Sequence, residues 1–550
     1  MTTWRNGAVW IARPPRRPLA LLWLIPLTVA VAYVVVFVLQ LPHNVTTVTW
    51  DSDYSSGFTV PETVFKTGTD GNVVLGSAGQ WVPLWFGLAT ATLPLHRELW
   101  ELAPTLLFVA TTLIVGWSVA QLAGRRAAVL AVLIGLIASP LALTFFMAAV
   151  AHNTVYPCTA LLGAYLIWLA RGDGRRALTA LGVPPLAGIV LGTCLASDLL
   201  LAAAAAIPLT ITAVLSGLRR DRRSRVVALS ALCTVAVAVP IAELTSSIMH
   251  SLGFLTLETP ARVAPLSELP ERARLLFDGL KVLFNGYLGV QRPGTLHTEL
   301  GIASDIVMSA ALLALALAGV VTVVRFLVSG LRKDGRRSPA QLACSLHVVY
   351  WVTSALSVCG VFWLTAETGG GSNLHESYYA TVIFSVAAVI PLLLSGRPLA
   401  RWLIAAGASV LFTASLVGLA SGYFVVSPWI AREQSGVMRI AQENHVTVGY
   451  GGYGAASSLT WNAHGRVTVR PLMECENPEG ASVCPFYMES VPSWYVPRQR
   501  HTFLLVDSEE VWVSSLPSGL GRPLASYSLG AMQMYIYPYD IASRLGPERD

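Results

Sequence analysis

Long apolar stretches, repeated along most of the chain and separated by short clusters of basic residues, constrain this sequence more than any other feature. As helices, stretches of about 18 or more apolar residues match the roughly 30 Å hydrocarbon core of a bilayer. Hydrophobic residues make up 54% of the 550 and charged residues 12%, and the mean hydropathy is +0.59. Because a soluble protein of this size could not bury so much apolar surface, the sequence predicts an integral membrane protein.

The basic clusters predict the side of the membrane on which each loop lies. Lys and Arg in short loops stay on the cytoplasmic side, and intervals of about forty residues between clusters have room for two helical crossings. Most intervals are therefore expected to hold a helical hairpin. The apolar stretch 18–41 is too long for a signal peptide and is predicted to be the first span, with a cytoplasmic N-terminus. The clusters are Arg125 and Arg126; Arg171, Arg175 and Arg176; Arg219, Arg220, Arg222, Arg223 and Arg225; Arg332, Lys333, Arg336 and Arg337; Arg397 and Arg401.

The predicted fold is an all-α polytopic membrane protein of about eleven transmembrane helices, with a small C-terminal extracytoplasmic α/β domain. Residues 1–427 form the transmembrane domain, with a first outer loop at 42–103 and a long outer loop at 248–300. In 428–550, period-two alternation predicts short strands. Cys475 and Cys484 lie in this outer domain, where an oxidising exterior favours a disulfide.

Charge and motifs exclude several classes of function. The net charge of +6 does not point to nucleic acid, because most of the arginines belong to the cytoplasmic loops. The sequence has no phosphate-binding Gly-rich loop ending in Lys-Ser/Thr, no dinucleotide-binding Gly-x-Gly-x-x-Gly after a strand and no His-Glu-x-x-His. Nucleotide-driven pumping and zinc-protease chemistry are therefore unsupported.

An acidic pair in the first outer loop is the best candidate for chemistry. Asp51 and Asp53 are separated by one residue, so they can share a divalent cation or divide into a base and a metal ligand. The alternative is a solvated loop in which Asp caps the next helix. The following segment, 80–95, is short for a span and carries tryptophans, which is typical of a helix lying in the membrane interface.

Other outer positions are weaker candidates. Arg97, just after the interfacial segment, either holds a lipid phosphate or reaches lipid headgroups. His152 and Asn153 occupy one predicted hairpin turn, and Asp198 occupies another, where it either faces a site or caps the following helix.

This order of a span, an acidic outer loop, an interfacial helix, hairpins and an outward C-terminal domain resembles the C-type superfamily of membrane glycosyltransferases, which take sugars from polyprenyl-phosphate carriers. The segments 449–453, 458–461, 466–471 and 493–495 are similar to the soluble cap of bacterial, especially actinobacterial, members. The resemblance covers the whole chain loosely.

The resemblance implies that an acceptor hydroxyl at the outer face of the plasma membrane attacks the anomeric carbon of a lipid-linked sugar, with inversion, while polyprenyl phosphate leaves. Asp51 matches the first-loop acid of the family and is assigned as the base, and Asp53 is assigned to metal or acceptor binding, although these roles can be reversed. A divalent cation (Mg, Mn or Ca) or basic side chains would stabilise the leaving phosphate. His152, Asn153 and Asp198 are assigned to acceptor binding or support.

The donor-binding residues are expected in three outer segments. Where the family often has an Arg-Tyr pair, this chain has His375, Glu376, Tyr378 and Tyr379. Because the Arg is missing, the phosphate contact shifts to Arg97 or to Lys281 and Arg292 of the long outer loop. The predicted donor set is His96, Arg97, Arg292, His375, Glu376 and Tyr378.

Two other functional classes stay open at this stage. A transporter or flippase would also be polytopic, and it would place ionisable residues at mid-membrane in inverted repeats; Glu243 is the main such residue. A non-catalytic scaffold would use the outer domain as a binding module. Within the glycosyltransferase class, the sugar is not specified, and neither is the glycan or lipid acceptor.

Overall fold

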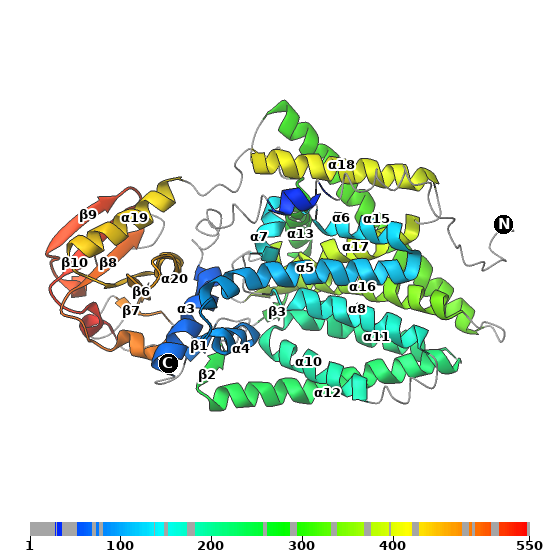
Figure 1. Ribbon diagram of the computed structural model, residues 1–550, viewed down its shortest axis with the longest axis horizontal. Coiled ribbons are helices and arrows are strands. Elements are labelled where there is room, and N and C mark those ends of the chain that lie inside the picture. Colours follow the sequence, from blue (N-terminus) through cyan, green and yellow to red (C-terminus); the bar gives the residue numbers. More distant parts are fainter. Residues whose placement is uncertain are drawn as a thin grey trace.

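A bundle of apolar helices with a small C-terminal domain at one end forms the described part of the chain (Figure 1). The structure is a computed structural model that describes residues 28, 30–35, 52–68, 73–75, 81–136, 138–147, 152–172, 182–219, 221–256, 261–286, 294–331, 338–367, 376–394, 398–420, 428–475, 483–486, 490–507, 516 and 518–546.

Within these residues, four helices are long and apolar enough to cross a membrane. They are α5 (His96–Ala123), α12 (Arg222–Ser251), α15 (Thr295–Leu331) and α16 (Pro339–Leu364). The shorter bundle helices are α6 (Arg125–Leu136), α7 (Pro140–Met147), α8 (Val155–Arg171), α10 (Val183–Ser197), α11 (Ile207–Gly217), α17 (Thr381–Leu394) and α18 (Pro398–Ala420). The multi-pass architecture is thus found, while the count of about eleven spans stays a prediction.

The outer surfaces of these helices are apolar, as a lipid environment requires. Leu313, Leu317, Val320 and Val324 of α15 are all exposed, and their spacing of three to four residues places them along one side of the helix. Water would make such a stripe unfavourable, whereas lipid tails are as apolar as the side chains.

Small residues let two of the helices approach closely. A Cβ atom on Gly188 of α10 would lie 2.6 Å from the Thr234 carbonyl oxygen of α12, and one on Gly192 would lie 2.4 Å from that of Ala238. The two glycines are four residues apart and therefore share one side of α10. This is the small-xxx-small packing by which membrane helices gain van der Waals contact.

A short π-helical segment, η2 (Ala202–Ala206), interrupts the regular backbone before α11. Ser354 of α16 donates its hydroxyl to the Ala204 carbonyl at 2.6 Å, and Ser357 donates to the Ala203 carbonyl. Backbone groups released from the α-helical pattern need new partners inside a membrane, and these two hydroxyls supply them.

Described arginines of the basic clusters gather at the end of the bundle away from the C-terminal domain. Arg171 donates to Gln121 near the end of α5 at 2.9 Å, and Arg223 donates to the carbonyl of Gly172 at the end of α8. Arg219 donates to the Phe326 carbonyl of α15 at 3.1 Å. The ends of four helices therefore share one side, as the predicted hairpins require; the assignment of that side to the cytoplasm stays a prediction.

The described parts of the predicted outer loops gather at the opposite end. The first outer loop forms α3 (Ser52–Thr67), β1 (Val73–Leu75) and α4 (Trp81–Thr90), so a short helix does lie within 80–95. The long loop forms β2 (Phe254–Thr256), β3 (Ala261–Val263) and α13 (Leu269–Leu283). β1 pairs in parallel with β2, and β3 pairs antiparallel with β4 (Thr365–Glu367). Two separate two-stranded sheets thus tie three loops together through the long loop.

The C-terminal domain is a six-stranded mixed sheet with the order β7-β6-β5-β8-β10-β9. The central strand β5 runs parallel to β6 and β8, and α20 (Tyr453–Asn462) connects β5 to β6. Helices α19 (Pro428–Glu443) and α20 share a core with the sheet. The predicted small domain of short strands is therefore present. The strands are β5 (Val448–Gly452), β6 (Thr468–Glu474), β7 (Val483–Pro485), β8 (Thr502–Asp507), β9 (Ala525–Leu529) and β10 (Met532–Tyr537).

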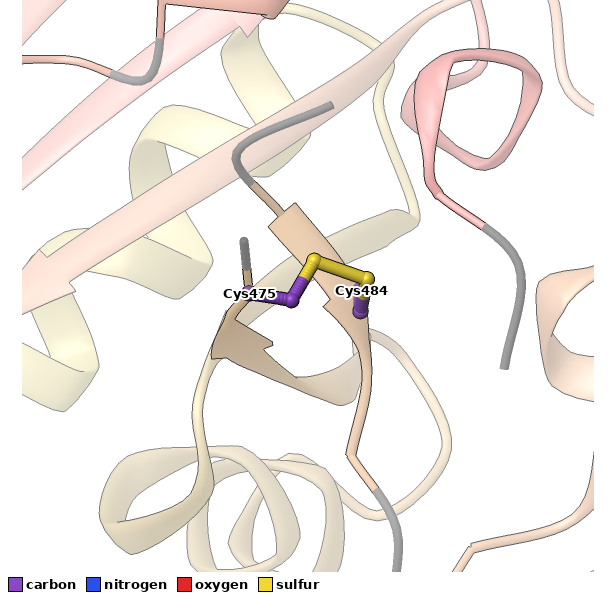
Figure 2. Close-up of a disulfide and its surroundings, with 2 residues drawn as sticks. All are labelled: Cys475 and Cys484. Carbon is purple, nitrogen blue, oxygen red and sulfur yellow. A yellow bond between two sulfur atoms is a disulfide. The ribbon is translucent and has the colours of Figure 1, made fainter. Parts of the chain in front are cut away.

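A disulfide joins Cys475, just after β6, to Cys484 in β7, the pair that the sequence predicts (Figure 2). The two residues are nine positions apart and both are buried. Because β7 has three residues and pairs with β6 alone, the covalent link holds an edge strand that has few backbone bonds of its own.

Removing this disulfide is expected to destabilise the C-terminal domain by about 2–3 kcal/mol, from the loop-closure entropy of a chain of about ten residues. The Cys475→Ser/Cys484→Ser double variant should show a lower unfolding temperature and faster proteolysis of residues 428–550. Cys233→Ser, which removes an exposed free cysteine of α12, is the matched control and should behave as wild type. Equal proteolysis rates for both variants would contradict the structural role.

Candidate functional site

One acid of the predicted pair in the first outer loop lies at the start of α3. Asp51 lies outside the described residues, and Asp53 is the second residue of the helix. Farther along α3, Phe58 and Val64 are buried, and the helix packs against both α4 and α20. Figure 1 shows α3 between the bundle and the C-terminal domain. The helix that carries Asp53 therefore lies where the two parts of the protein meet.

Arg97, a predicted phosphate-binding residue, is held by α3 and by the C-terminal domain. Its Nη2 donates to both carboxylate oxygens of Glu62, at 2.9 and 2.7 Å. Its Nη1 donates to the Trp461 carbonyl at 3.0 Å and lies 3.2 Å from His464 Nδ1. Binding a donor phosphate would require the guanidinium to leave these partners, and that role for Arg97 stays a prediction.

Glu62 carries the negative charge of this contact. Burial alone would raise the pKa of its carboxyl, but hydrogen bonds and charge from Arg97 and Lys66 outweigh burial and lower the pKa below its ordinary value of 4.5. The Lys66 Nζ lies 2.7 Å from Glu62 Oε1. Glu62 is therefore ionised at neutral pH and paired with two cations.

The second predicted donor residue in this segment, His96, joins α4 to α5. Its Nδ1 lies 3.2 Å from the Thr90 hydroxyl at the end of α4. Its ring meets Trp100 edge-on, with centroids 6.4 Å apart. These contacts fix the turn between the two helices.

The structure brings His152 and Asp198 together from two hairpin turns. His152 Nδ1 lies 2.6 Å from Asp198 Oδ2, and both side chains are nearly buried. Asp198 Oδ1 accepts the Leu200 backbone N–H at 2.9 Å, which fixes the carboxylate. His152 has a φ of 64°, a left-handed conformation that few residues other than glycine adopt and that is often retained at functional sites.

Tyr378 from a third loop completes this cluster. Its ring meets the His152 ring edge-on at 5.0 Å and stacks on Phe362 of α16 at 4.8 Å. Tyr378 belongs to the 3₁₀ segment η3 (Glu376–Tyr379). A predicted donor residue and two predicted acceptor residues thus come into contact, although they are far apart in sequence.

The chemical capacity of the His152–Asp198 pair follows from its orientation. A carboxylate at Nδ1 favours the proton on that nitrogen, so a neutral imidazole presents the Nε2 lone pair as a hydrogen-bond acceptor. Asn153, the third member of the predicted acceptor set, donates its Nδ2 to the Phe146 carbonyl at 2.8 Å and is buried. This hydrogen bond therefore anchors the turn that carries His152.

The long outer loop contributes one described basic candidate. Lys281 of α13 lies 3.6 Å from Asp278 Oδ1 and 3.6 Å from Asp305 Oδ2 of α15. Its Nζ is also 5.0 Å from the Phe277 ring centroid. Arg292 and His375 lie outside the described residues, and Glu376 is the first residue of η3.

Sequence reasoning missed the partners of its own candidates. Glu62, Trp461 and Asp305 each contact a predicted residue; Glu62 and Asp305 were not singled out, and Trp461 entered only as the end of the segment 458–461. Asp305 gave a usable signal, because an acid within an apolar helix is costly unless it has a partner or a role. Nothing in the sequence indicated that Glu62 or Trp461 contacts Arg97, since both are distant from it along the chain.

A metal site is not assembled from described side chains alone. Among the described residues, no group of three or more His, Cys, Asp or Glu side chains is arranged to hold a metal ion. The predicted ligands include Asp51, which lies outside them, so a metal at the acidic pair stays a prediction.

Comparison with known proteins gives distant structural similarities. No protein-family profile and no curated protein matches the chain. ArnT from Cupriavidus metallidurans in the apo state is similar at 14% identity over 94% of this chain and 100% of that chain, with a TM-score of 0.41. The same protein bound to undecaprenyl phosphate is similar at 15% identity over 94% of this chain and 99% of that chain, also with a TM-score of 0.41. The Archaeoglobus fulgidus oligosaccharyltransferase in complex with Zn and sulfate is similar at 12% identity, 83% of this chain and 64% of that chain, with a TM-score of 0.41. Likeness at this level does not establish a shared activity.

The ion pair of Glu62 predicts a pH dependence. Because the pKa of Glu62 is lowered in the folded protein, the pair adds stability above pH 4.5 and loses it as the pH falls through the lowered pKa. Glu62→Gln should therefore lower the unfolding temperature at pH 7, and the difference from wild type should shrink as the pH falls below 4.5. Glu443→Gln, which removes the exposed partner of Arg439, should show almost no difference at either pH. A pH-independent effect of Glu62→Gln would contradict the ion pair.

Proposed function

We propose that this protein is a membrane glycosyltransferase that moves a hexose or pentose from a polyprenyl-phosphate donor to an acceptor hydroxyl at the outer membrane face. The acceptor is a glycan or a lipid of the cell envelope, and the anomeric centre is inverted. In this proposal the C-terminal domain is extracytoplasmic and the lipid chain of the donor is embedded in the bilayer.

The observation that carries the proposal is the position of α3. This helix carries Asp53 in its first turn and is held between the C-terminal domain and the bundle end that bears the predicted outer loops. A lipid-linked donor has its sugar and phosphate at the membrane surface and its chain in the bilayer, so acids at such an end would meet the reacting bond. The His152–Asp198–Tyr378 cluster lies at the same end of the bundle, which supports an acceptor region nearby.

In the proposed reaction, Asp51 accepts the proton of the acceptor hydroxyl. The hydroxyl oxygen forms a bond to the anomeric carbon while the bond from that carbon to the phosphate oxygen breaks, and the electron pair leaves with polyprenyl phosphate. An inverting transfer needs one such carboxylate as base. Asp53 binds the acceptor or a metal, and these two roles can be exchanged. A divalent cation at the pair would stabilise the phosphate charge.

The donor phosphate is assigned to the basic residues of the long outer loop, Lys281 and Arg292, and the sugar to the η3 segment. Lys281 is partly exposed and stands beside two carboxylates, each 3.6 Å from its Nζ. The transporter alternative has less support, because Glu243 is exposed on α12, whereas functional acids of transporters face the bundle interior.

Asparagine at either acid is expected to remove sugar transfer while leaving the fold intact. Wild type, Asp51→Asn and Asp53→Asn would be purified in detergent and offered a panel of radiolabelled polyprenyl-phosphate sugars, with and without chelator. Loss of the base should lower kcat by about 10²–10⁴-fold. Glu271→Gln, which removes an exposed outer carboxylate paired with Arg274, is the matched control and should retain activity.

Three outcomes separate the proposals. Transfer that disappears in Asp51→Asn supports the base assignment and identifies the sugar. Restoration of chelated enzyme by Mg, Mn or Ca supports the metal. A folded wild type that consumes no donor in the panel, or acid variants as active as wild type, would overturn the function and bring the transporter forward.

The His152–Asp198 pair is expected to act on the acceptor. His152→Asn and Asp198→Asn should each raise the acceptor KM about tenfold, the effect of losing one hydrogen bond of about 1–1.5 kcal/mol. Hydrolysis of the donor by water should change little, because it needs no acceptor. An equal loss of hydrolysis and transfer would instead place the pair in donor binding or folding.

A further inference from the structure

Arg97 and Trp461 form the centre of the contact between the C-terminal domain and the bundle. Trp461 lies in α20 and is 1% exposed. Its ring stacks on Phe58 of α3 with centroids 4.8 Å apart, and the Arg97 guanidinium lies 4.4 Å from its centroid. The indole Nε1 donates to Glu101 Oε1 of α5 at 3.1 Å. One side chain of the C-terminal domain therefore meets two separate elements of the membrane part.

Arg97 binds its partners at this contact through both terminal nitrogens of its planar guanidinium group. One terminal nitrogen binds both oxygens of Glu62 on α3, and the other binds the Trp461 carbonyl on α20. Arg97 itself is the second residue of α5. Its guanidinium thus joins three helices, which a lysine could not do with the same geometry, because an ammonium lacks the fixed fork.

The contact is close enough to Asp53 to set the position of the first turn of α3. Phe58 and Glu62 follow Asp53 by five and nine residues on α3, or about 8 and 13 Å along the helix axis at 1.5 Å per residue. Because a helix transmits its orientation over such a length, fixing these two residues fixes the first turn of α3. Misplacement of a reacting group by about 1 Å can cost about 10²-fold in rate.

We propose that the Arg97–Trp461 contact is a positioning device that holds the C-terminal domain against α3 and thereby positions the first turn of that helix, which carries Asp53, for sugar transfer. This inference rests on the proposed function for its catalytic part. It gives Arg97 a task different from phosphate binding, and it makes the C-terminal domain a component of the active enzyme.

The test uses the full-length protein with Arg97→Lys, Trp461→Phe and the double variant. Amide hydrogen exchange over residues 52–67 is measured first, because it reads the position of α3 without any substrate. Both single variants should exchange faster over α3, while exchange over the buried helix α16 should stay at the wild-type rate. Arg439→Lys, at an exposed ion pair of α19, is the matched control and should leave α3 unchanged.

Kinetics then separate positioning from binding. Each single variant should lower kcat by about 10–100-fold and change the donor KM by less than about threefold. The double variant should be little worse than either single variant, because both disrupt one contact. A donor KM that rises while kcat is unchanged would overturn the inference, since it would return Arg97 to phosphate binding.

The remaining outcomes distinguish this inference from the proposed function. If wild type uses no donor, the proposed function fails, and exchange alone decides whether the contact holds α3. Faster exchange in the variants supports the contact, and unchanged protection of α3 in both single variants overturns it whatever the activity.

Discussion

The absence of water from the bilayer core is the constraint on which the rest of this structure depends. A backbone group in hydrocarbon must find its partner within the protein, so the crossing segments are helices. The exception in the described bundle, the π-helical segment η2, has hydroxyls of Ser354 and Ser357 on its carbonyls. The same constraint places the short strands β1 to β4 at one end of the bundle, where water and other loops can satisfy the backbone.

Confining irregular structure to that end also concentrates the polar side chains there. Loops that are distant in sequence, such as those carrying His152, Asp198 and Tyr378, meet because their helices begin or end at the same level. The C-terminal domain adds a further layer through Trp461, whose contact with Arg97 spans 364 positions of sequence. Membrane topology thus brings the candidate residues together before any specific contact selects their geometry.

Several charged side chains at this end of the bundle are paired with groups of opposite charge. Glu62 holds Arg97 and Lys66, Asp198 holds His152, and Lys281 stands between two carboxylates. A donor phosphate bound here would have to compete with these carboxylates for the basic side chains. Binding therefore depends on which basic side chain can exchange its carboxylate for the phosphate. Lys281, at 3.6 Å from both carboxylates, is held less tightly than Arg97, which makes four close contacts.

Local chemistry explains which predictions the sequence supported. Apolar length and basic clusters specified crossing helices and a shared end for the arginines, because both follow from partition between lipid and water. Alternation predicted the strands of the C-terminal domain, and the position of two cysteines predicted their disulfide. The order of the sheet, with β5 between β6 and β8, was not predicted, because period-two alternation does not specify which strand pairs with which.

The candidate site shows the same difference between what the sequence predicts and what only the structure decides. The sequence by itself predicted that acids and aromatic residues lie in loops between the crossing helices, since helix length and loop charge indicate which segments leave the membrane. Only the tertiary structure decided that His152 meets Asp198, that Tyr378 lies against His152, and that Arg97 is held by Glu62 and Trp461. The reason is physical: partition acts on each segment separately, whereas a hydrogen bond or a stacked ring depends on the distance between segments, which only the packed bundle sets.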